Sequence, residues 1–399
     1  MVGRHRNRPG RWLRRLAAVL AVLIVLVPVA GFGLYLYYQT RISHVALSFP
    51  PGYRRPAGVR GSVTYLLIGS DSRAGTGREY NSSGLATGRN SDTQILAHLD
   101  ADGSATLVSF PRDTYVLIPG YTDARGRAHP AAPNRINAAF GLGGPTLTIQ
   151  TMESLTGLRI DHFIEVDLAG FKQITDAVGG IDVCLKSSPT VEVGLDDLGH
   201  PFRSTNLDDP FTQFHGHPGT LHLDGDQALA FVRQRHGLPT GDLDRIKRQQ
   251  LFLAAAYRKA TSSSVLLDPT SLLPLLNAAT GALTTDPQTS LTDLRSVLAQ
   301  LRGTDPTRIH LETLPTRWPT AADGADRHGL VHGMSVLIYD RGAADAMLAP
   351  LRATAPAPSS AAPSPAAVSP ASPPGARPST ASPQPSGSSL TVASDRCTY

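Results

Sequence analysis

An uncharged apolar segment near the start of the chain most restricts how this protein can fold. It runs from Leu16 to Thr40 and contains 25 residues without one Asp, Glu, Lys or Arg. A helix needs about 20 predominantly apolar residues to cross the hydrocarbon core of a bilayer. The segment therefore predicts a single membrane-spanning helix over residues 16–40, to which the rest of the protein is attached.

The charges next to this segment predict its orientation. Lys and Arg gather on the cytoplasmic side of membrane helices. Six arginines and no acidic residue precede the segment: Arg4, Arg6, Arg8, Arg11, Arg14 and Arg15. We therefore expect residues 1–15 to be cytoplasmic and everything after Arg41 to lie outside the cell. The predicted protein crosses the cell membrane once, with its N-terminus inside and its C-terminus outside.

A cleavable signal peptide is the competing interpretation, because Pro28, Val29 and Ala30 are weakly similar to a processing site. The apolar run continues beyond this point, however, through Leu34 to Tyr38. Tyrosines at the end of such a run suit the interface between lipid and water. We therefore expect an uncleaved anchor.

The net charge means little once the N-terminal arginines are set apart. The formal charge is +5, but without those arginines the chain has 31 basic and 32 acidic residues. Overall basicity is therefore no argument for a nucleic-acid partner, and we expect none.

Cysteine usage agrees with a location outside the cytoplasm. The chain has two cysteines, Cys184 and Cys397. Two are too few for a disulfide scaffold but suit one bridge in an oxidising compartment. We predict that they pair, because the bridge would fasten an otherwise free tail to the domain.

Predicted strands and helices alternate along the middle of the chain. Short aliphatic runs predict strands, and helical spacing of apolar residues predicts helices. The alternation favours an α/β fold in which helices cover both faces of a mixed central sheet. The strands are expected at 63–68, 93–99, 105–110, 162–166, 180–185, 308–314 and 335–339, and the helices at 145–155, 168–178, 224–235, 244–260 and two or three places between 266 and 301.

Composition marks the two ends of the folded domain. Residues 41–61 contain several prolines and glycines and predict a stalk. From residue 352 to Ser389 the sequence is almost wholly Ala, Pro, Ser, Gly and Thr. Such a composition buries too little apolar surface to offset chain entropy. We therefore expect one domain over 62–351 and a disordered or extended tail over 352–399.

Arginines are concentrated between Phe231 and Gln250, in the sequence FVRQRHGLPTGDLDRIKRQQ. Four lie within sixteen residues: Arg233, Arg235, Arg245 and Arg248. A solvated basic helix face is the simpler interpretation of such a run. Guanidiniums so close together repel one another unless an anion lies among them, and their forked geometry matches phosphate. The run therefore makes a phosphate-bearing ligand the first hypothesis.

Four short polar clusters precede this run, each after a predicted strand or at the start of a helix. They have the sequences GSDSR at 69–73, GRNSDT at 88–93, FPRDT at 110–114 and NRIN at 134–137. Ligand-binding groups of α/β sheets gather at such positions. The first cluster lacks the GK[ST] ending of a P-loop, so we expect no nucleotide site there.

Two acids in these clusters predict a cation site. Asp71 and Asp92 would be neighbours at the ends of adjacent strands. Two close carboxylates repel unless a cation lies between them, and Mg²⁺ prefers hard oxygen ligands that face phosphate. Other catalytic motifs are absent from the sequence, including GxSxG, SxxK and HExxH. His162 lies in a predicted strand, and we expect it to be a hydrogen-bonded core residue rather than a ligand.

Taken in order, these clusters and the arginine run resemble the LytR-CpsA-Psr family of cell-wall enzymes. The likeness is strong over residues 62–260 and weaker on to residue 350. The resemblance implies a phosphotransferase that takes an anionic wall glycopolymer from a polyprenyl diphosphate carrier. The enzyme would join this polymer through a phosphodiester to peptidoglycan, at the MurNAc 6-hydroxyl. Mg²⁺ or Mn²⁺ would be the cofactor, and the carrier-linked donor, the peptidoglycan acceptor and the cytoplasmic membrane would be the partners.

The resemblance also implies roles for single residues. Asp71 and Asp92 would be the metal ligands, and Asp113 and Asp242 are the candidates for the base that activates the sugar hydroxyl. Arg135 stands where the family often has lysine, and Arg89 lies one place before the position at which the family commonly has arginine. The catalytic group would be Arg112, Asp113, Arg233, Arg235, Arg245 and Gln249, with Arg73, Arg89, Arg135 and Arg248 as further pyrophosphate-binding residues.

Two other functions stay open at this point. In a polyprenyl pyrophosphate hydrolase, water would replace the sugar hydroxyl and the same residues would serve. A non-catalytic envelope protein would bind anionic polymer or regulate wall stress. The acidic pair disfavours pure binding, because Asp71 and Asp92 would repel a polyanion unless a metal were bound.

Overall fold

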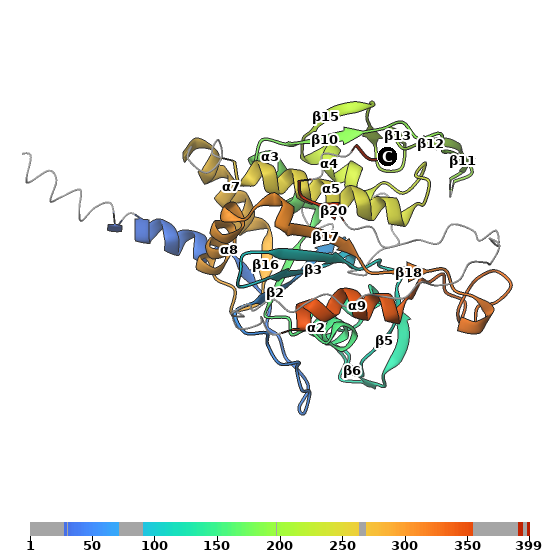
Figure 1. Ribbon diagram of the computed structural model, residues 1–399, viewed down its shortest axis with the longest axis horizontal. Helices are drawn as coiled ribbons and strands as arrows, with labels where there is room; N and C mark the ends of the chain where they lie inside the picture. Colours follow the sequence, from blue (N-terminus) through green and yellow to red (C-terminus); the bar gives the residue numbers. More distant parts are fainter. Residues whose placement is uncertain are drawn as a thin grey trace, which may run out of the picture.

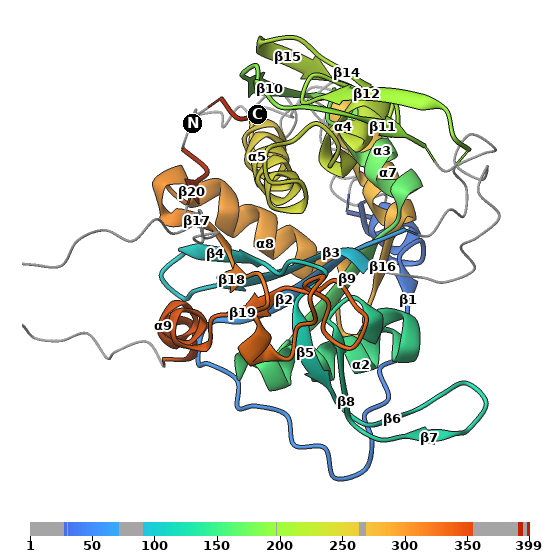
Figure 2. The same ribbon diagram turned by 90° about the vertical axis from the view of Figure 1, so that its right-hand side faces the viewer.

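The computed structural model describes residues 28–29, 31–71, 91–196, 198–262, 269–353, 390–393 and 397–399. A mixed eight-stranded sheet runs through the middle of this described part, and helices cover both of its faces (Figures 1 and 2). The α/β fold predicted from the sequence is therefore confirmed. In spatial order the sheet contains β1 (Ser43–His44), β16 (Leu283–Thr285), β9 (His162–Val166), β2 (Val63–Ser70), β3 (Ser91–Leu99), β4 (Ala105–Ser109), β17 (Ile309–Thr313) and β20 (Leu390–Thr391).

The central strand β2 is buried on both sides. It pairs in parallel with β9 and antiparallel with β3. Leu66 and Ile68 belong to the hydrophobic core beside α2 (Ala138–Thr156) and α9 (Arg341–Arg352). Tyr65 belongs to the core on the opposite face, beside α5 (Asp242–Ala260) and α8 (Leu291–Gly303). Because both faces are covered, the strand is a continuous apolar run, without the alternation of a half-exposed strand.

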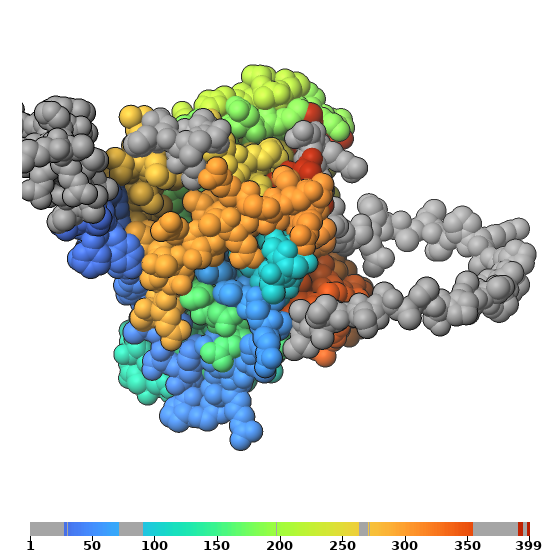
Figure 3. All heavy atoms as spheres, turned by 60° about the vertical axis from the view of Figure 1, so that its left-hand side comes forward, coloured from blue at the N-terminus to red at the C-terminus, as the bar shows by residue number. Residues whose placement is uncertain are grey.

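The two helical layers are visible on either side of the sheet in Figure 2. In Figure 3, α8 (orange) and α7 (Pro269–Ala282, gold) form a band between the blue N-terminal segment and the yellow-green part of the molecule. α3 (Leu168–Ala177) packs closely on α7, since a Cβ added at Gly170 would lie 2.5 Å from that of Ala282. A larger residue than glycine would separate the two helices.

Side chains just before the helices explain where they begin. Asp167 Oδ1 accepts a hydrogen bond from Gly170 N at 2.7 Å at the start of α3. Asp224 accepts one from Gln227 N at 2.9 Å before α4 (Gly225–Arg233). A capping box of Ser290 and Asp293 precedes α8. These side chains satisfy backbone N–H groups that have no partner inside the helix.

A second hydrophobic core lies beyond α5. β10 (Ile181–Leu185) does not join the central sheet but pairs with β15 (Gly219–Leu223), a strand that the sequence did not predict. Their side chains pack on α4 and on Ala255 of α5. Other short strands form small sheets: β5 (Tyr115–Ile118) with β8 (Ala132–Arg135), β6 (Tyr121–Thr122) with β7 (Ala128–His129), β18 (Thr316–Arg317) with β19 (Ile338–Tyr339), and the four strands β11 (Val191–Leu195), β12 (Pro201–Thr205), β13 (Asp208–Asp209) and β14 (Phe214–His215).

The end of the chain is ordered, so the prediction of a disordered tail over 352–399 is wrong for its last part. β20 pairs antiparallel with β17, and Val392 is 2% exposed. Cys397 forms a disulfide with Cys184, which is the pairing predicted from the sequence. Pairing with β17 and the disulfide attach these last residues to the folded domain. Residues 354–389 lie outside the described part of the chain.

The predicted membrane segment is described only at its C-terminal end. Residues 31–39 are helical, whereas residues 1–27 are not among those described. Of the helices in the described ranges, none is long and apolar enough to span a bilayer.

Arg248 fills a position in the second core and is 0% exposed. Its Nη1 donates to Gln234 Oε1 at 2.7 Å, its Nη2 to Asn206 O at 2.5 Å and its Nε to Tyr399 O at 2.9 Å. Each guanidinium nitrogen is thus engaged inside the protein. The prediction that Arg248 binds pyrophosphate is therefore replaced by a structural role, in which it ties α5 to the last residue described.

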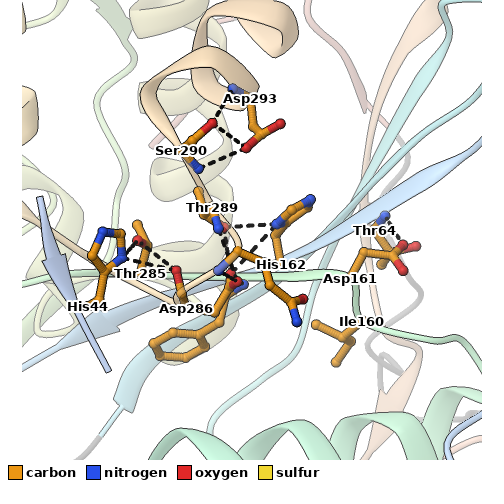
Figure 4. Close-up of polar contacts among 12 residues, drawn as sticks. His44, Thr64, Ile160, Asp161, His162, Thr285, Asp286, Thr289, Ser290 and Asp293 are labelled. Carbon is orange, nitrogen blue, oxygen red and sulfur yellow. Dashed lines mark hydrogen bonds and ion pairs between the residues drawn. The ribbon is translucent and has the colours of Figure 1, made fainter. Parts of the chain in front are cut away.

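A buried polar network joins β9 to the segment before α8 (Figure 4). Asp286 is 1% exposed and accepts hydrogen bonds from Phe163 N at 2.9 Å and from Thr289 Oγ1 at 2.5 Å. His162 Nδ1 lies 2.8 Å from Thr289 Oγ1 and 3.7 Å from Asp286 Oδ2. His44 Nδ1 of β1 lies 3.1 Å from Asp286 O. His162 is therefore hydrogen-bonded, as predicted, but it is half-buried and does not belong to the core.

We predict that Arg248→Met destabilises the protein strongly. The rings of Phe231 and Phe214 lie 4.6 Å and 5.2 Å from the guanidinium, and methionine would keep these apolar contacts but leave three oxygen acceptors unpaired. Removing one partner from such a buried set costs roughly 3 kcal/mol or more. Urea unfolding measures this loss, with the exposed Arg203→Met as control. Equal effects of the two substitutions would contradict the structural role.

We also predict that His162 makes stability depend on pH. Burial alone would lower the pKa of His162, but the hydrogen bond and charge of Asp286, aided by Asp293 and Asp161, raise it. A histidine whose folded pKa is raised stabilises the fold below its unfolded pKa of about 6.5, and the contribution disappears as pH rises through the folded pKa. The Tm advantage of the wild type over His162→Gln should therefore shrink as pH rises above the unfolded pKa of about 6.5. A constant Tm difference would refute this prediction.

Candidate active site

Segments far apart in the sequence meet at the end of the central sheet where β2 stops and β3 begins. Arg112 Nη1 lies 2.6 Å from Asp92 Oδ1, and Arg245 Nη2 lies 2.8 Å from Asp242 Oδ1. Arg245 Nη2 also lies 3.5 Å from the main-chain oxygen of Asp92. These contacts bring β3, the loop after β4 and the start of α5 together. We call the whole group the arginine–aspartate cluster: Asp92, Arg112, Asp113, Arg135, Arg235, Asp242 and Arg245.

A bulge in β3 positions Asp92. In the pairing of β2 with β3, Gly69 is opposite Thr93 while Ser70 is opposite Ser91, so that Asp92 is the additional residue. Bulges re-aim a side chain and are frequent beside active sites. Asp71 directly follows Ser70. The two acids therefore lie at neighbouring strand ends, as the sequence predicted.

The loop after β4 is fixed by main-chain bonds on both sides of Arg112. Asn137 N donates to Arg112 O at 3.2 Å, and Leu337 N donates to Asp113 O at 2.9 Å. Arg135, at the end of β8, places Nη1 at 3.5 Å from Asp113 Oδ1, and Arg112 Nε is 3.5 Å from Asp113 Oδ2. The carboxylate of Asp113 thus lies between two guanidiniums.

The first turn of α5 supplies Asp242 and Arg245. Three residues apart on a helix, the two side chains lie on one face and pair. Gly241, which precedes the helix, has a φ of 56°, a conformation that glycine adopts without a Cβ clash. Arg245 is only 4% exposed, so its charge is held inside the protein by the neighbouring carboxylates. The spacing of these residues was visible in the sequence, but their pairing was not predicted.

The cluster perturbs the ionisation of its members. Burial would raise the pKa of Asp92, but the guanidiniums of Arg112, Arg245 and Arg235 outweigh this effect and lower it. Burial would lower the pKa of Arg112, yet the carboxylates of Asp92, Asp113 and Asp242 raise it. The pKa of Arg245 is lowered, first by burial and then by the other arginines. The Asp92–Arg112 pair is therefore ionised on both sides.

Several buried polar atoms in the cluster point to a ligand. The Nε atoms of Arg112, Arg135 and Arg245 make no hydrogen bond within the part of the chain that the structure describes. Neither carboxylate oxygen of Asp242 accepts a hydrogen bond in this part of the chain, although Asp242 Oδ1 forms the ion pair with Arg245. Buried polar groups in native proteins are rarely left without a partner. Three guanidinium donors within one cluster suit an anion with several oxygens.

The remaining predicted site residues are placed as follows. Arg235 is exposed and close enough to Asp92 and Arg245 to affect their ionisation. Arg233 is the last residue of α4, and Gln249 Nε2 donates to the neighbouring Val232 O at 3.3 Å. Gln249 thus holds α5 against the end of α4 and positions the loop between the two helices, residues 234–241, which carries Arg235 and which we call the arginine loop. Arg73 and Arg89 lie outside the described residues.

The sequence predicts Asp71 and Asp92 as ligands of a hard divalent cation, and the two acids lie at neighbouring strand ends. No group of three His, Cys, Asp or Glu side chains able to hold a metal occurs among the described residues. Mg²⁺ is commonly bound by one or two carboxylates together with substrate phosphates and water. Asp71 and Asp92 are therefore sufficient as protein ligands only if a phosphate supplies the others.

Known proteins are similar to this chain in sequence or in fold. Probable cell wall biosynthesis protein LcpB of Corynebacterium glutamicum is 32% identical over 359 residues, which are 88% of this chain and 74% of that protein. The polyisoprenyl-teichoic acid–peptidoglycan teichoic acid transferase TagU of Bacillus cereus is 33% identical over 204 residues, 51% of this chain and 54% of that protein. The structure of a LytR-Csp2A-Psr enzyme from Actinomyces oris aligns with a TM-score of 0.55 at 20% identity, over 78% of this chain and 96% of that one.

The LytR_cpsA_psr family model matches residues 42–353. The matched range contains every residue of the arginine–aspartate cluster, both acids of the predicted cation site and the helices on both faces of the sheet. On this match and on the identity to LcpB, the chain belongs to the LytR-CpsA-Psr family.

Proposed function

We propose that this protein is a phosphotransferase that moves an anionic cell-wall glycopolymer from a polyprenyl diphosphate carrier to peptidoglycan. The buried, unpaired guanidinium nitrogens of the arginine–aspartate cluster are the observation that carries this proposal. The name of the relative TagU describes a transfer of the same kind, and the name of LcpB describes cell-wall biosynthesis. The acceptor would be the MurNAc 6-hydroxyl, and the reaction would take place on the outer side of the cytoplasmic membrane.

The chemistry requires charge neutralisation more than covalent help. The sugar hydroxyl oxygen attacks the phosphorus that bears the glycopolymer, and the bond from this phosphorus to the bridging oxygen breaks. Polyprenyl phosphate leaves with the electron pair, and the hydroxyl proton passes to a carboxylate. Donors fixed in advance around the developing charge lower the barrier without reorganisation. Arg112 meets this condition, because Asp92 holds it at 2.6 Å and the loop bonds hold its backbone.

Arg245 would contribute to the same phosphates from the opposite side. Its guanidinium is almost fully buried and already paired with Asp242, so little orientational freedom is lost when an anion binds. Arg235 and Arg233, at the end of α4, would complete the anion-binding group from a more open position. The oxygens of Asp113 and Asp242 are the acceptors available for the proton, since both carboxylates lie within 4 Å of Arg112.

We further propose that Asp71 and Asp92 hold Mg²⁺ or Mn²⁺ together with the pyrophosphate. When bound, the cation would neutralise negative charge on the phosphate oxygens. Asp92 would then exchange part of its ion pair with Arg112 for metal ligation, which would free a guanidinium donor for the substrate.

Two alternative functions can each be distinguished from this proposal by one measurement. A hydrolase releases polyprenyl phosphate without an acceptor, because water attacks the phosphorus. A binding protein takes up the polymer and releases no polyprenyl phosphate. The buried, paired Arg245 favours catalysis over mere binding, since a surface that only binds polymer gains little from a guanidinium so far removed from water. Only dependence on the acceptor separates the transferase from the hydrolase.

We predict acceptor-dependent transfer by the purified full chain. A radiolabelled polyprenyl diphosphate-linked oligosaccharide, incubated with uncrosslinked peptidoglycan and Mg²⁺, should leave its label on the glycan strands. A chelator should abolish this labelling, and Mn²⁺ should restore it. Release of polyprenyl phosphate at the same rate with and without peptidoglycan would establish a hydrolase. Binding without any released phosphate would reduce the protein to a binding module.

We predict that Arg112→Ala and Arg245→Lys each lower the transfer rate by about 10²-fold to 10³-fold, the loss typical for one donor of a preorganised anion site. Lysine keeps the charge of Arg245 but loses its forked geometry. The exposed Arg125→Ala, which removes an arginine remote from the cluster, should retain the full rate. Single-turnover assays at saturating donor measure this effect. If Arg245→Lys reacts at the wild-type rate, Arg245 does not contact the transferred phosphate.

A further inference from the structure

A group of aromatic rings lies directly beside the arginine loop. His236, the residue after Arg235, stacks on Phe211 with ring centroids 4.3 Å apart. Phe202 packs edge-on against Phe211 at 4.7 Å and lies 5.8 Å from the His236 ring. Phe211 is 45% exposed although it is a large apolar side chain. The small sheet of β11–β14 thus presents an open aromatic surface next to the candidate active site.

A carboxylate borders these rings. Glu192 of β11 places Oε1 at 2.8 Å from His236 Nδ1 and accepts a hydrogen bond from Gly237 N at 3.0 Å. Its side chain is 43% exposed, so lone pairs of the carboxylate face solvent. Gln234 Nε2 donates to Thr205 O at 2.6 Å and fixes the same loop to β12. The aromatic rings and the loop that carries Arg235 are therefore one rigid unit.

The turn that carries Phe211 is also fixed in advance. The fully buried Asp209 accepts hydrogen bonds from Ser204 Oγ at 2.7 Å and from Thr212 Oγ1 at 2.8 Å. Gln213, at the end of the turn, has a φ of 62°, which residues other than glycine seldom adopt. A strained turn that is held by a buried carboxylate keeps an apolar ring exposed, and such strain is concentrated at functional sites.

We infer that Phe202, Phe211, His236 and Glu192 form a subsite that binds a sugar ring of the acceptor glycan. The C–H face of a pyranose ring is apolar and carries partial positive charge, which suits the negative face of an aromatic ring. The hydroxyl and amide groups at the edge of the sugar are donors for an exposed carboxylate. Because His236 directly follows Arg235, a glycan on this surface extends toward the phosphates held by the arginine–aspartate cluster. The identification of the glycan as the acceptor rests on the proposed transferase function.

The chemistry of the surface favours a glycan over a lipid or a protein partner. The opposite face of β11 exposes the aliphatic side chains Val191, Val193 and Leu195, which are between 45% and 69% exposed. That face suits purely apolar contacts. The subsite of Phe211 combines flat rings with a carboxylate, which is the combination that recognises the two faces and the polar rim of a sugar.

The test compares a substitution in the aromatic subsite with a substitution on the apolar face of β11. Isothermal titration of the full chain with a GlcNAc–MurNAc tetrasaccharide from uncrosslinked peptidoglycan should give a Kd that rises about tenfold in Phe211→Ser, the loss expected for one ring contact. Val193→Ser, at an apolar position that is even more exposed than Phe211, should leave the Kd unchanged. In the transfer assay, Phe211→Ser should raise the KM for peptidoglycan while kcat and the KM for the carrier-linked donor stay at their wild-type values.

The possible outcomes separate this subsite from the proposed function. Binding that depends on Phe211 in a protein without transfer activity would support the subsite and overturn the transferase. Transfer with the same acceptor KM in wild type and Phe211→Ser, together with an unchanged Kd, would support the transferase and overturn the subsite. An equal loss of tetrasaccharide binding in Val193→Ser would also overturn it, because the apolar face would then be the binding surface.

Discussion

The ion pair between Arg112 and Asp92 holds together the part of the molecule on which the chemistry depends. The pair joins the bulge at the start of β3 to the loop after β4, and Arg245 reaches the same bulge from α5. Several positive charges are kept close together only because carboxylates from other segments lie between them. This balance leaves guanidinium nitrogens unsatisfied, and a phosphate-bearing substrate would satisfy them.

α5 connects this cluster to the stability of the whole domain. Its first turn carries Asp242 and Arg245, its middle carries the buried Arg248, and its later residues pack against the central sheet. Gln249 fastens it to α4, whose last turn leads to Arg235. A single helix thus positions the anion-binding side chains on one side and secures the end of the chain on the other. Arginine serves both purposes because its fork bonds equally well to phosphate and to main-chain oxygens.

The extent of sequence-based prediction differs between the fold and the site. Five strands of the central sheet (β2, β3, β4, β9 and β17) were predictable because they are aliphatic runs between turn residues, and Asp71 and Asp92 were placed correctly at neighbouring strand ends. The short strands β1, in the segment predicted to be a stalk, and β16, in a region predicted to be helical, were not predicted. All four arginines of the run were assigned to catalysis or pyrophosphate binding, since periodicity does not distinguish a side chain in a buried core from one in an open cleft. The structure assigns Arg245 to the cluster and Arg248 to the core. Strand β20 was missed because only a few apolar residues after the Pro- and Ser-rich segment indicate it.

The sequence by itself determined the elements, the charged motifs and their order, because these depend on local spacing and on residue chemistry. The tertiary structure alone decided which charges meet. Asp92 and Arg245 are far apart in the chain, and only the pairing of β2 with β3 and the packing of α5 on the sheet bring them together. The same holds for Phe211 and His236, whose stacking depends on the fold of the small sheet. Contacts between distant segments are set by packing as a whole, and no local pattern records them.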